Sequence, residues 1–279
     1  MHEIVAMRDV APNVHELVID APDVAAKAQP GQFAVVIPDE LGERIPMSLA
    51  GWDRDEGTVS IFFLEAGVST MKLAQHEAGD EIDFMAPLGT PATIKQYGTV
   101  FVGGGCYGVG AIYPILAAMK EAGNQVITAI EARSDFLLYN ESKLRERSDM
   151  FFRATSDGSI GSRGKVKDVL RSLVEQGETI DRCYFMGCTF MMMVSSRAAG
   201  EHGIPSFVYL NPLMVDATGM CGVCRVTVNG ETRFACVDGP EFPGSQVDWE
   251  ELFHRKSQYA PYEREAYRHT CRLRGDRDD

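Results

Sequence analysis

Four residues near position 220 form the pattern with the clearest chemistry. Asp216 stands five positions before Cys221, and Cys224 follows after two intervening residues. Cys236 lies twelve positions further on. Plant-type two-iron clusters are bound by C-x4-C-x2-C and a fourth cysteine, so the aspartate takes the place of the first cysteine. Because a carboxylate is an anionic ligand that ferric iron accepts, the spacing predicts a [2Fe–2S] cluster with these four residues as its ligands.

Two other interpretations of these cysteines stay open from the residues alone: a structural zinc site and buried free thiols. Zinc binds three thiolates and a carboxylate, but its usual pattern has two C-x2-C pairs and this chain has one. Gly219 and Gly222 favour the cluster, because they let the loop wrap closely enough for backbone N–H groups to point at sulfur. The total of seven cysteines is odd, which argues against a disulfide framework and for a reducing, cytoplasmic location.

Composition limits the classes of protein to which the chain can belong. Its 279 residues are 45% apolar and 24% charged, which is typical of a globular protein of about two domains. The net charge of −13 repels phosphate backbones, so we expect no nucleic-acid partner. No apolar run reaches the roughly 18 residues of a membrane helix, and residues 1–4 lack the pattern of a signal peptide. We therefore expect no membrane span.

A glycine-rich loop at 102–110 lies between a predicted strand, 99–102, and a predicted helix. Glycines at such a turn let backbone N–H groups approach the phosphates of a dinucleotide, and the helix dipole favours the negative charge. Two further loops, at 157–161 and 186–192, follow later strands at the same expected edge of the sheet. The alternative is a flexible turn without a ligand. The predicted nucleotide-binding residues are Gly103, Gly104, Gly105, Gly108, Gly110, Asp157, Gly187 and Cys188.

These candidate sites need several kinds of scaffold. Residues 1–96 contain short alternating or apolar runs separated by turn residues, which predicts an antiparallel β-barrel. Residues 97–212 alternate strands with helical patterns, which predicts a doubly wound parallel sheet. Residues 213–246 form a small lobe around the cysteines, and 247–279 fit a C-terminal helix or tail. The predicted fold class is therefore α+β with several domains.

The order of barrel, nucleotide domain and cysteine lobe resembles one branch of the ferredoxin reductase superfamily, the dihydroorotate dehydrogenase electron-transfer subunits. Within that branch, the chain is most similar to the small FAD-containing subunits of NADH-dependent ferredoxin:NADP oxidoreductase and of sulfide dehydrogenase. The most specific stretches are Leu210–Val228 and Phe234–Phe242, which in that branch hold a two-iron cluster with an aspartate ligand. This sequence keeps all four ligand positions.

The resemblance also implies an FAD site in the barrel. The stretch 44–48 is similar to the flavin motif of the branch and contains Arg44, Pro46, Met47 and Ser48. The resemblance implies that Arg44 contacts the FAD pyrophosphate and that Ser48 lies near the isoalloxazine. A guanidinium suits a pyrophosphate because it donates two parallel hydrogen bonds. A second phosphate loop is implied at Gly67, Ser69 and Thr70.

The implied function is electron transfer between NAD(H), FAD and the [2Fe–2S] cluster, to or from a larger flavin or iron–sulfur partner subunit. Cys106, Tyr107 and Cys188 depart from the branch in the loops expected to bind the nicotinamide dinucleotide. The alternative is therefore an FAD and [2Fe–2S] docking subunit that binds no pyridine nucleotide. Glu131 favours NADH over NADPH, because its carboxylate would accept a bond from a ribose 2′-hydroxyl. The aromatic-rich segment 249–267 fits an interface with that partner or a helix packed on its own domain.

Overall fold

The structure is a computed structural model that describes residues 1–40 and 42–274, with side chains as far as residue 270. The end of the expected C-terminal segment, 275–279, lies outside the described residues. None of the helices in the described part of the chain combines the length and the apolarity that crossing a bilayer requires.

The N-terminal third of the chain forms a closed barrel with the strand order β1-β2-β5-β4-β3-β6, and all neighbouring strands run antiparallel. The alternating sequence pattern produces it, because every second side chain points inward. Leu17 and Ile19 on β2 and Ile61 on β5 are fully buried in this way. The strands are β1 (His2–Ala11), β2 (Val14–Asp20), β3 (Phe33–Ile37), β4 (Ile45–Asp53), β5 (Thr58–Leu64) and β6 (Glu81–Leu88), with helices α1 (Pro22–Ala25) and α2 (Val68–Leu73) in the connections.

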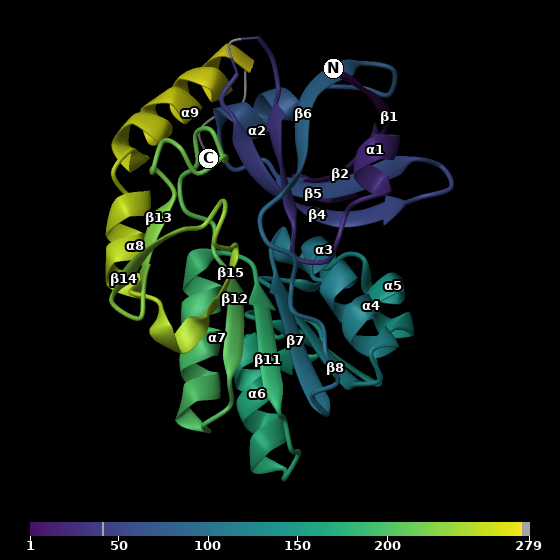
Figure 1. Cartoon of the computed structure of the whole chain (residues 1–279), viewed down its shortest axis with the longest axis vertical. Coiled ribbons are helices and arrows are strands. Elements are labelled where there is room, and N and C mark those ends of the chain that lie inside the picture. Colours follow the sequence, from purple (N-terminus) through teal and green to yellow (C-terminus); the bar gives the residue numbers. More distant parts are fainter. Residues whose placement is uncertain (41, 275–279) are drawn as a thin grey trace.

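Residues 99–209 form a doubly wound sheet, as the alternation of strands and helices predicts (Figure 1). Six parallel strands follow the order β10-β9-β8-β7-β11-β12. Successive residues of β7 point to opposite faces: Val100 packs with α4, and Phe101 packs with α6 and α7. The strands are β7 (Thr99–Gly105), β8 (Gln125–Ala132), β9 (Met150–Thr155), β10 (Ser162–Arg163), β11 (Arg182–Met186) and β12 (Ser206–Tyr209). The helices are α3 (Gly108–Ala111), α4 (Tyr113–Glu121), η1 (Asp135–Leu137), α5 (Glu141–Glu146), α6 (Val166–Glu175) and α7 (Thr189–Glu201).

The cysteine lobe is a short hairpin with long loops. β13 (Arg225–Val228) pairs with β14 (Glu231–Phe234) across Asn229 and Gly230, whose φ angles are 53° and 75°. Two positive φ angles match a type I′ turn, for which Asn-Gly is a preferred pair. β15 (Glu241–Pro243) lies in the lobe by sequence but pairs antiparallel with β12, so the lobe is anchored to the edge of the central sheet.

After the short helix η2 (Gly244–Gln246), two helices run back from the lobe toward the barrel (Figure 1). α8 (Trp249–Lys256) begins at Asp248, whose side chain accepts a hydrogen bond from the Glu251 N–H at 2.9 Å. α8 packs on β13, and α9 (Ala260–Arg274) packs on α2 of the barrel. The described C-terminal helices thus pack in part on their own chain, while Tyr259 and Tyr262 are 55% and 71% exposed, so the interface with a partner stays a prediction.

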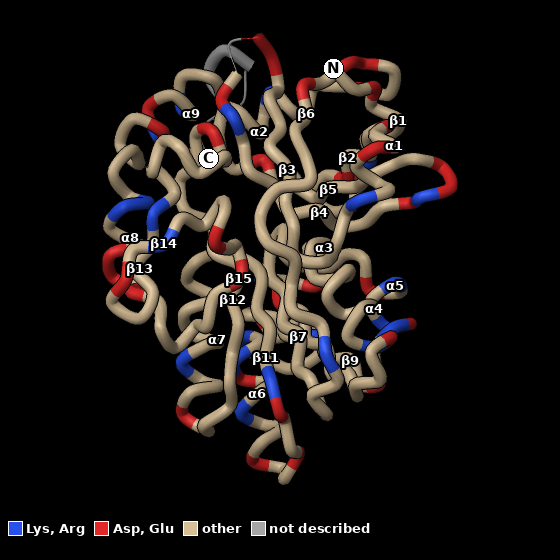
Figure 2. The backbone as a smooth tube through the Cα atoms, in the orientation of Figure 1, with Lys and Arg blue, Asp and Glu red and all other residues tan. Residues whose placement is uncertain are grey.

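Charged residues are spread along the whole fold. Figure 2 shows lysines and arginines interspersed with acidic residues on the barrel, on the sheet helices and on the C-terminal helices.

Candidate functional site

A cavity of about 1190 Å³ lies where the barrel, the central sheet, the cysteine lobe and the C-terminal helices meet. This volume exceeds the roughly 1000 Å³ at the upper end of ordinary small-molecule pockets, so it suits a large, extended ligand. The predicted cofactor residues that line the cavity are Pro46, Met47, Ser48, Gly67, Ser69, Thr70 and Cys188. The structure therefore brings the predicted flavin motif, the second phosphate loop and one nucleotide loop to a single space.

Arg44 is placed differently. It is exposed, immediately before β4 begins at Ile45, and is not among the described residues that line the cavity. Its predicted contact with a pyrophosphate would require the guanidinium to turn toward the cavity. That contact stays a prediction.

The hydroxyl groups at the start of α2 already have protein partners. Thr70 Oγ1 donates to the Gly67 carbonyl oxygen at 2.9 Å and accepts from the Gly67 N–H at 3.1 Å. Ser69 Oγ donates to a Glu43 carboxylate oxygen at 2.6 Å. Thr70 thus stabilises the first turn of α2, while Ser69 ties this helix to the segment before β4. A phosphate bound here would compete with Glu43 for the Ser69 hydroxyl.

The five glycines of the 102–110 loop are buried, and neighbouring protein atoms explain why they carry no side chain. A Cβ on Gly108 would lie 2.1 Å from the Met186 carbonyl oxygen, and a Cβ on Gly110 would lie 2.2 Å from Cδ2 of Phe62. The atom nearest to an added Cβ would lie at 2.6 Å for Gly103, at 2.8 Å for Gly104 and at 3.0 Å for Gly105. The glycines let β7 and α3 pack directly on β11 and the barrel, a role that the sequence interpretation missed.

Gly187 and Cys188 lie beside the turn at 105–107. The Tyr107 hydroxyl donates to the Gly187 carbonyl oxygen at 2.8 Å, and the side-chain amide of Asn211 donates to the same hydroxyl. A Cβ on Gly187 would lie 2.7 Å from the Gly105 carbonyl oxygen. The two predicted nucleotide loops therefore contact each other and form one wall of the cavity.

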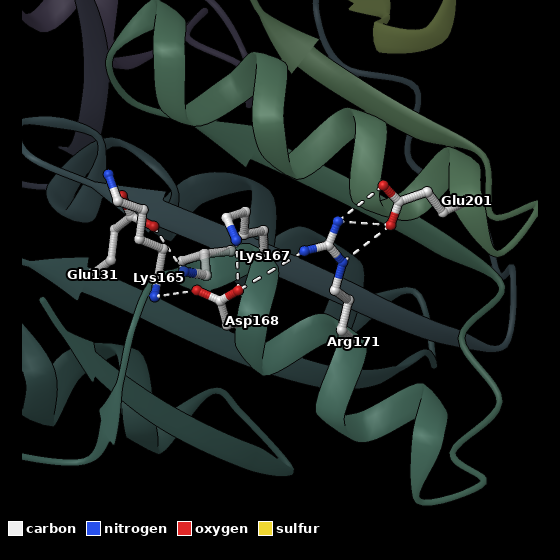
Figure 3. Close-up of polar contacts among 7 residues, drawn as sticks. Glu131, Lys165, Lys167, Asp168, Arg171 and Glu201 are labelled. Carbon is white, nitrogen blue, oxygen red and sulfur yellow. Dashed lines mark hydrogen bonds and ion pairs between the residues drawn. The ribbon is translucent and has the colours of Figure 1, made fainter.

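Two acidic residues expected near the nucleotide bind other parts of the protein. Asp157 accepts from the Ser134 hydroxyl at 2.5 Å, a bond that lowers the pKa of Asp157 and joins the loops that follow β8 and β9. Glu131 accepts from the Val166 N–H at 2.7 Å, at the start of α6 (Figure 3). Burial raises the pKa of Glu131. A ribose hydroxyl would have to share the Glu131 carboxylate with α6.

The cluster loop holds the four predicted ligands as two pairs. Cys224 and Cys236 are buried with their Sγ atoms 3.1 Å apart, which is longer than an S–S bond of about 2.0 Å, so both are free thiols. Asp216 accepts hydrogen bonds from the N–H groups of Thr218 at 2.8 Å and Cys221 at 2.9 Å. These bonds lower the pKa of Asp216 and keep its carboxylate anionic beside the exposed Cys221.

The chemistry of this donor set fits a two-iron cluster. Two thiolates bound at about 2.3 Å to one tetrahedral metal stand about 3.8 Å apart, so Cys224 and Cys236 need little movement to share one iron. Within the described residues, no three histidine, cysteine, aspartate or glutamate side chains are yet arranged around one metal position. The assignment of Asp216 and Cys221 to the second iron stays a prediction.

Several residues of the cavity lay outside the sequence prediction. Lys256 Nζ donates to Asn211 Oδ1 at 3.0 Å and to Thr189 Oγ1 at 2.9 Å. Burial lowers the pKa of Lys256 to about 8. The Tyr209 hydroxyl lines the same cavity and donates to Glu241 of β15. These residues come from separate elements, so no spacing along the chain could reveal that they meet.

Comparison with known proteins identifies the family. Residues 211–248 match the sequence model of the iron–sulfur cluster binding domain of dihydroorotate dehydrogenase B. A homolog of the dihydroorotate dehydrogenase B (NAD(+)) electron transfer subunit from Thermotoga maritima is 42% identical over 277 residues, which cover 99% of this chain and 98% of that protein. The electron transfer subunit from Desulforamulus reducens is 31% identical, with coverage of 89% and 97%.

Solved structures agree with the sequence relatives. The structure of an NADH-dependent reduced ferredoxin-NADP oxidoreductase, studied for flavin-based electron bifurcation, matches with a TM-score of 0.92 at 40% identity and covers 97% of this chain and 98% of that one. A ferredoxin NADP+ reductase from Neisseria gonorrhoeae shares the fold, with a TM-score of 0.60 at 16% identity and coverage of 72% and 90%. These findings confirm the predicted family, fold class and electron-transfer function. The chain belongs to the family of dihydroorotate dehydrogenase B electron transfer subunits and their homologues.

Proposed function

We propose that this chain is the FAD- and [2Fe–2S]-containing subunit of an NAD(H)-dependent oxidoreductase and that it works with a larger flavin or iron–sulfur subunit. The cavity is the observation that supports this most strongly. Its walls combine the barrel, the nucleotide loops and residues 211–214, which lead into the cluster loop. When bound, FAD supplies the conversion between a two-electron hydride and single electrons. The residues that would hold FAD lie next to the residues proposed to bind the pyridine nucleotide and the [2Fe–2S] cluster.

The barrel side of the cavity supplies residues suited to a flavin. Ser48, on β4, offers a hydroxyl, and the ring of Phe62 and the side chain of Met47 add apolar surface around it. Apolar walls exclude water, and a small number of polar groups set the orientation of the ligand. Lys256, which is half-buried, also lines the cavity and adds a cation. We assign Arg44 and the loop at 67–70 to the pyrophosphate.

The pyridine nucleotide is assigned to the carboxyl ends of β7 and β11. In doubly wound sheets, ligands bind at that edge, where Met186 and Cys188 line the cavity on either side of Gly187. The relative from Desulforamulus reducens is named for NAD(+), and the solved relative is described as NADH-dependent. Glu131 supports NADH over NADPH, because a carboxylate disfavours a ribose 2′-phosphate.

Exposed apolar residues surround the proposed cluster. Val215, Met220 and Val237 are 54%, 87% and 44% exposed, close to the exposed Cys221. A Cβ on Gly219 would lie 3.0 Å from Val237, so Met220 and Val237 belong to one patch. Exposed apolar surface of this kind is typical of protein interfaces. We therefore assign this patch to the larger partner subunit, which would place the cluster next to the electron acceptor or donor.

Cofactor analysis and an anaerobic titration test the proposal. The chain, purified anaerobically with any partner that accompanies it, should contain about one FAD and two irons, with matching sulfide. NADH should bleach the flavin faster than NADPH does. Stoichiometric zinc without iron or sulfide would contradict the cluster. A flavin that neither nucleotide reduces would instead identify the docking subunit that binds no pyridine nucleotide.

A further inference from the structure

Cys106 and Cys188 meet at the wall of the cavity. Cys106 directly follows β7 and is exposed, while Cys188 follows β11 and is half-buried. Both residues line the cavity. Neither belongs to the predicted cluster ligands, which follow residue 215.

The strand register brings the two cysteines to the same edge of the sheet. β7 and β11 are parallel neighbours whose register ends with Gly104 opposite Met186, and each cysteine follows two residues after its member of that pair. Neighbouring strands lie about 4.8 Å apart, and disulfides join Cα atoms about 4.4–6.8 Å apart. The residues just before the cysteines are in contact, since a Cβ on Gly187 would lie 2.7 Å from the Gly105 carbonyl oxygen. Each thiol also shifts the pKa of the other, which requires the two sulfur atoms to be near each other. The fold therefore brings the pair together on adjoining loops at one edge of the sheet.

The two thiols have different environments. The pKa of Cys188 is lowered to about 6. The causes are its interaction with the Cys106 thiol, the N–H groups of Met191 and Phe190 at the start of α7, and the charge of Lys165. The same interaction with Cys188, together with partial desolvation of its sulfur in the cavity wall, raises the pKa of Cys106 although the residue as a whole is exposed. These interactions favour the thiolate at Cys188 and the protonated thiol at Cys106. This is the asymmetry of an attacking and a resolving cysteine.

The backbone at Cys106 also sets this residue apart. Its φ is +53°, in the left-handed region that costs a residue with a side chain roughly 1–2 kcal/mol relative to glycine. The Tyr139 hydroxyl donates to the Cys106 carbonyl oxygen at 2.9 Å and holds the turn in this conformation. A cysteine in a position that favours glycine indicates a use for its thiol.

Lysines lie near the pair. Lys165 and Lys256 both interact electrostatically with Cys188. Glu131 also faces Cys106, but its carboxylate accepts the Val166 N–H, and Glu263 interacts with Lys256. Arg264 and Arg268 line the same cavity and add positive charge, which favours a ligand that carries negative charge.

We propose that Cys106 and Cys188 form a redox-active dithiol that reduces a small, carboxylate-bearing disulfide within the cavity. The Cys188 thiolate attacks one sulfur of the disulfide RSSR, forms a Cys188–S–SR bond and releases RS⁻, which takes a proton from water. Cys106 loses its proton to water, attacks the Cys188 sulfur and releases the second RS⁻, which is also protonated. The cysteine pair loses two electrons and becomes a disulfide, and RSSR gains two electrons and becomes two RSH. Excess RSH drives the same exchange in reverse and restores both thiols.

Glutathione buffers test this inference on the full-length protein with its cofactors. The protein is equilibrated anaerobically at several ratios of glutathione to glutathione disulfide, quenched with acid, alkylated and analysed by peptide mass spectrometry. We expect a Cys106–Cys188 disulfide in the oxidising buffers that excess glutathione reverses. In Cys106→Ser, the reaction should stop at a mixed disulfide between Cys188 and glutathione. In Cys188→Ser, Cys106 should react at least about tenfold more slowly at pH 7, because little of it is thiolate.

The buried Cys183 is the internal control, because burial alone raises the pKa of its thiol and it should stay unmodified in every buffer. Two results would overturn the inference: thiols that stay free at every ratio, or glutathione on each cysteine without an internal disulfide. Circular dichroism checks that the variants fold. Even where a variant misfolds, the thiol–disulfide equilibrium of the wild-type protein shows whether Cys106 and Cys188 form a disulfide. The mass-spectrometric measurement does not depend on flavin or iron content. A result that overturns the dithiol inference would therefore leave the proposed electron-transfer function intact.

Discussion

Gly110 lies directly against the ring of Phe62, where a Cβ at position 110 would stand 2.2 Å from Cδ2 of the ring. Gly110 belongs to α3 and Phe62 to β5, so this contact joins the nucleotide domain to the barrel. The Phe62 ring also packs on Tyr139, with ring centroids 5.4 Å apart, and the Tyr139 hydroxyl accepts the Gly110 N–H at 3.2 Å. The missing side chain therefore sets how closely the sheet approaches the barrel at one wall of the cavity.

Gly110→Ala should destabilise the protein by about 1–3 kcal/mol, because the added methyl group overpacks a buried contact that cannot open without separating the domains. Gly200→Ala is the matched control, since Gly200 lies in α7 and an added Cβ would meet open space. The control should be neutral or stabilising by up to about 1 kcal/mol through helix propensity. Urea unfolding midpoints of both variants measure the difference. Equal midpoints would show that the Phe62 ring moves aside for the added methyl group at little cost in stability.

Asp216→Cys should retain the cluster, because it restores the four-cysteine spacing of plant-type sites. Its EPR spectrum should change, since a thiolate is a softer and more covalent donor than a carboxylate. Asp216→Ala should make the cluster labile and lower the iron content. In the structure, Asp216 accepts two loop N–H groups, so it also stabilises the loop without metal. An unchanged EPR spectrum in Asp216→Cys, with the substitution verified by mass, would remove Asp216 from the ligand set.

Arg44→Ala should weaken FAD binding about tenfold or more, because a hydrogen bond to a charged group contributes roughly 1.5–3 kcal/mol. Arg54 is the matched control: it is an exposed arginine in the turn between β4 and β5. Flavin content after gel filtration and fluorescence titration of the apoprotein with FAD compare the two variants. FAD binding by Arg44→Ala that equals that of Arg54→Ala would exclude the pyrophosphate contact.

Lys256 should make stability increase between pH 8 and about pH 10.5. Burial lowers its pKa from 10.5 to about 8, so in this window the unfolded chain binds more protons than the folded chain. The free energy of unfolding therefore rises with pH in this window, by an amount on the order of a few kcal/mol. Below pH 8 the Lys256 side chain is charged in the folded protein, and its desolvation lowers the stability by the full amount.

Lys256→Met removes the titrating group and should abolish that part of the rise. Urea unfolding at pH 7.5 and pH 10 measures it, with Lys27→Met, at an exposed position, as the control. If Lys256→Met and wild type gain the same stability between the two pH values, Lys256 is not the group responsible.

The sequence by itself determined the classes of element and the site chemistry. Alternating residues such as Leu17 and Ile19 predicted the barrel because a strand has a side-chain period of two. The spacing of Asp216, Cys221 and Cys224 predicted a cluster loop because ligands to one cluster must lie within a few residues or on adjoining loops. These are short-range patterns, and short-range patterns are visible in a single chain.

Only the tertiary structure decided which distant residues share a space. The cavity needs Ser48, Cys188 and Lys256 together, although they are separated by 140 and 68 positions along the chain. It also added a packing role for Gly108 and Gly110, which a local pattern assigns to phosphates: a side chain at either position would clash with Met186 or Phe62. The physical reason is that close packing and cavity walls depend on the pairing of strands and the docking of domains, which combine contacts far apart in sequence.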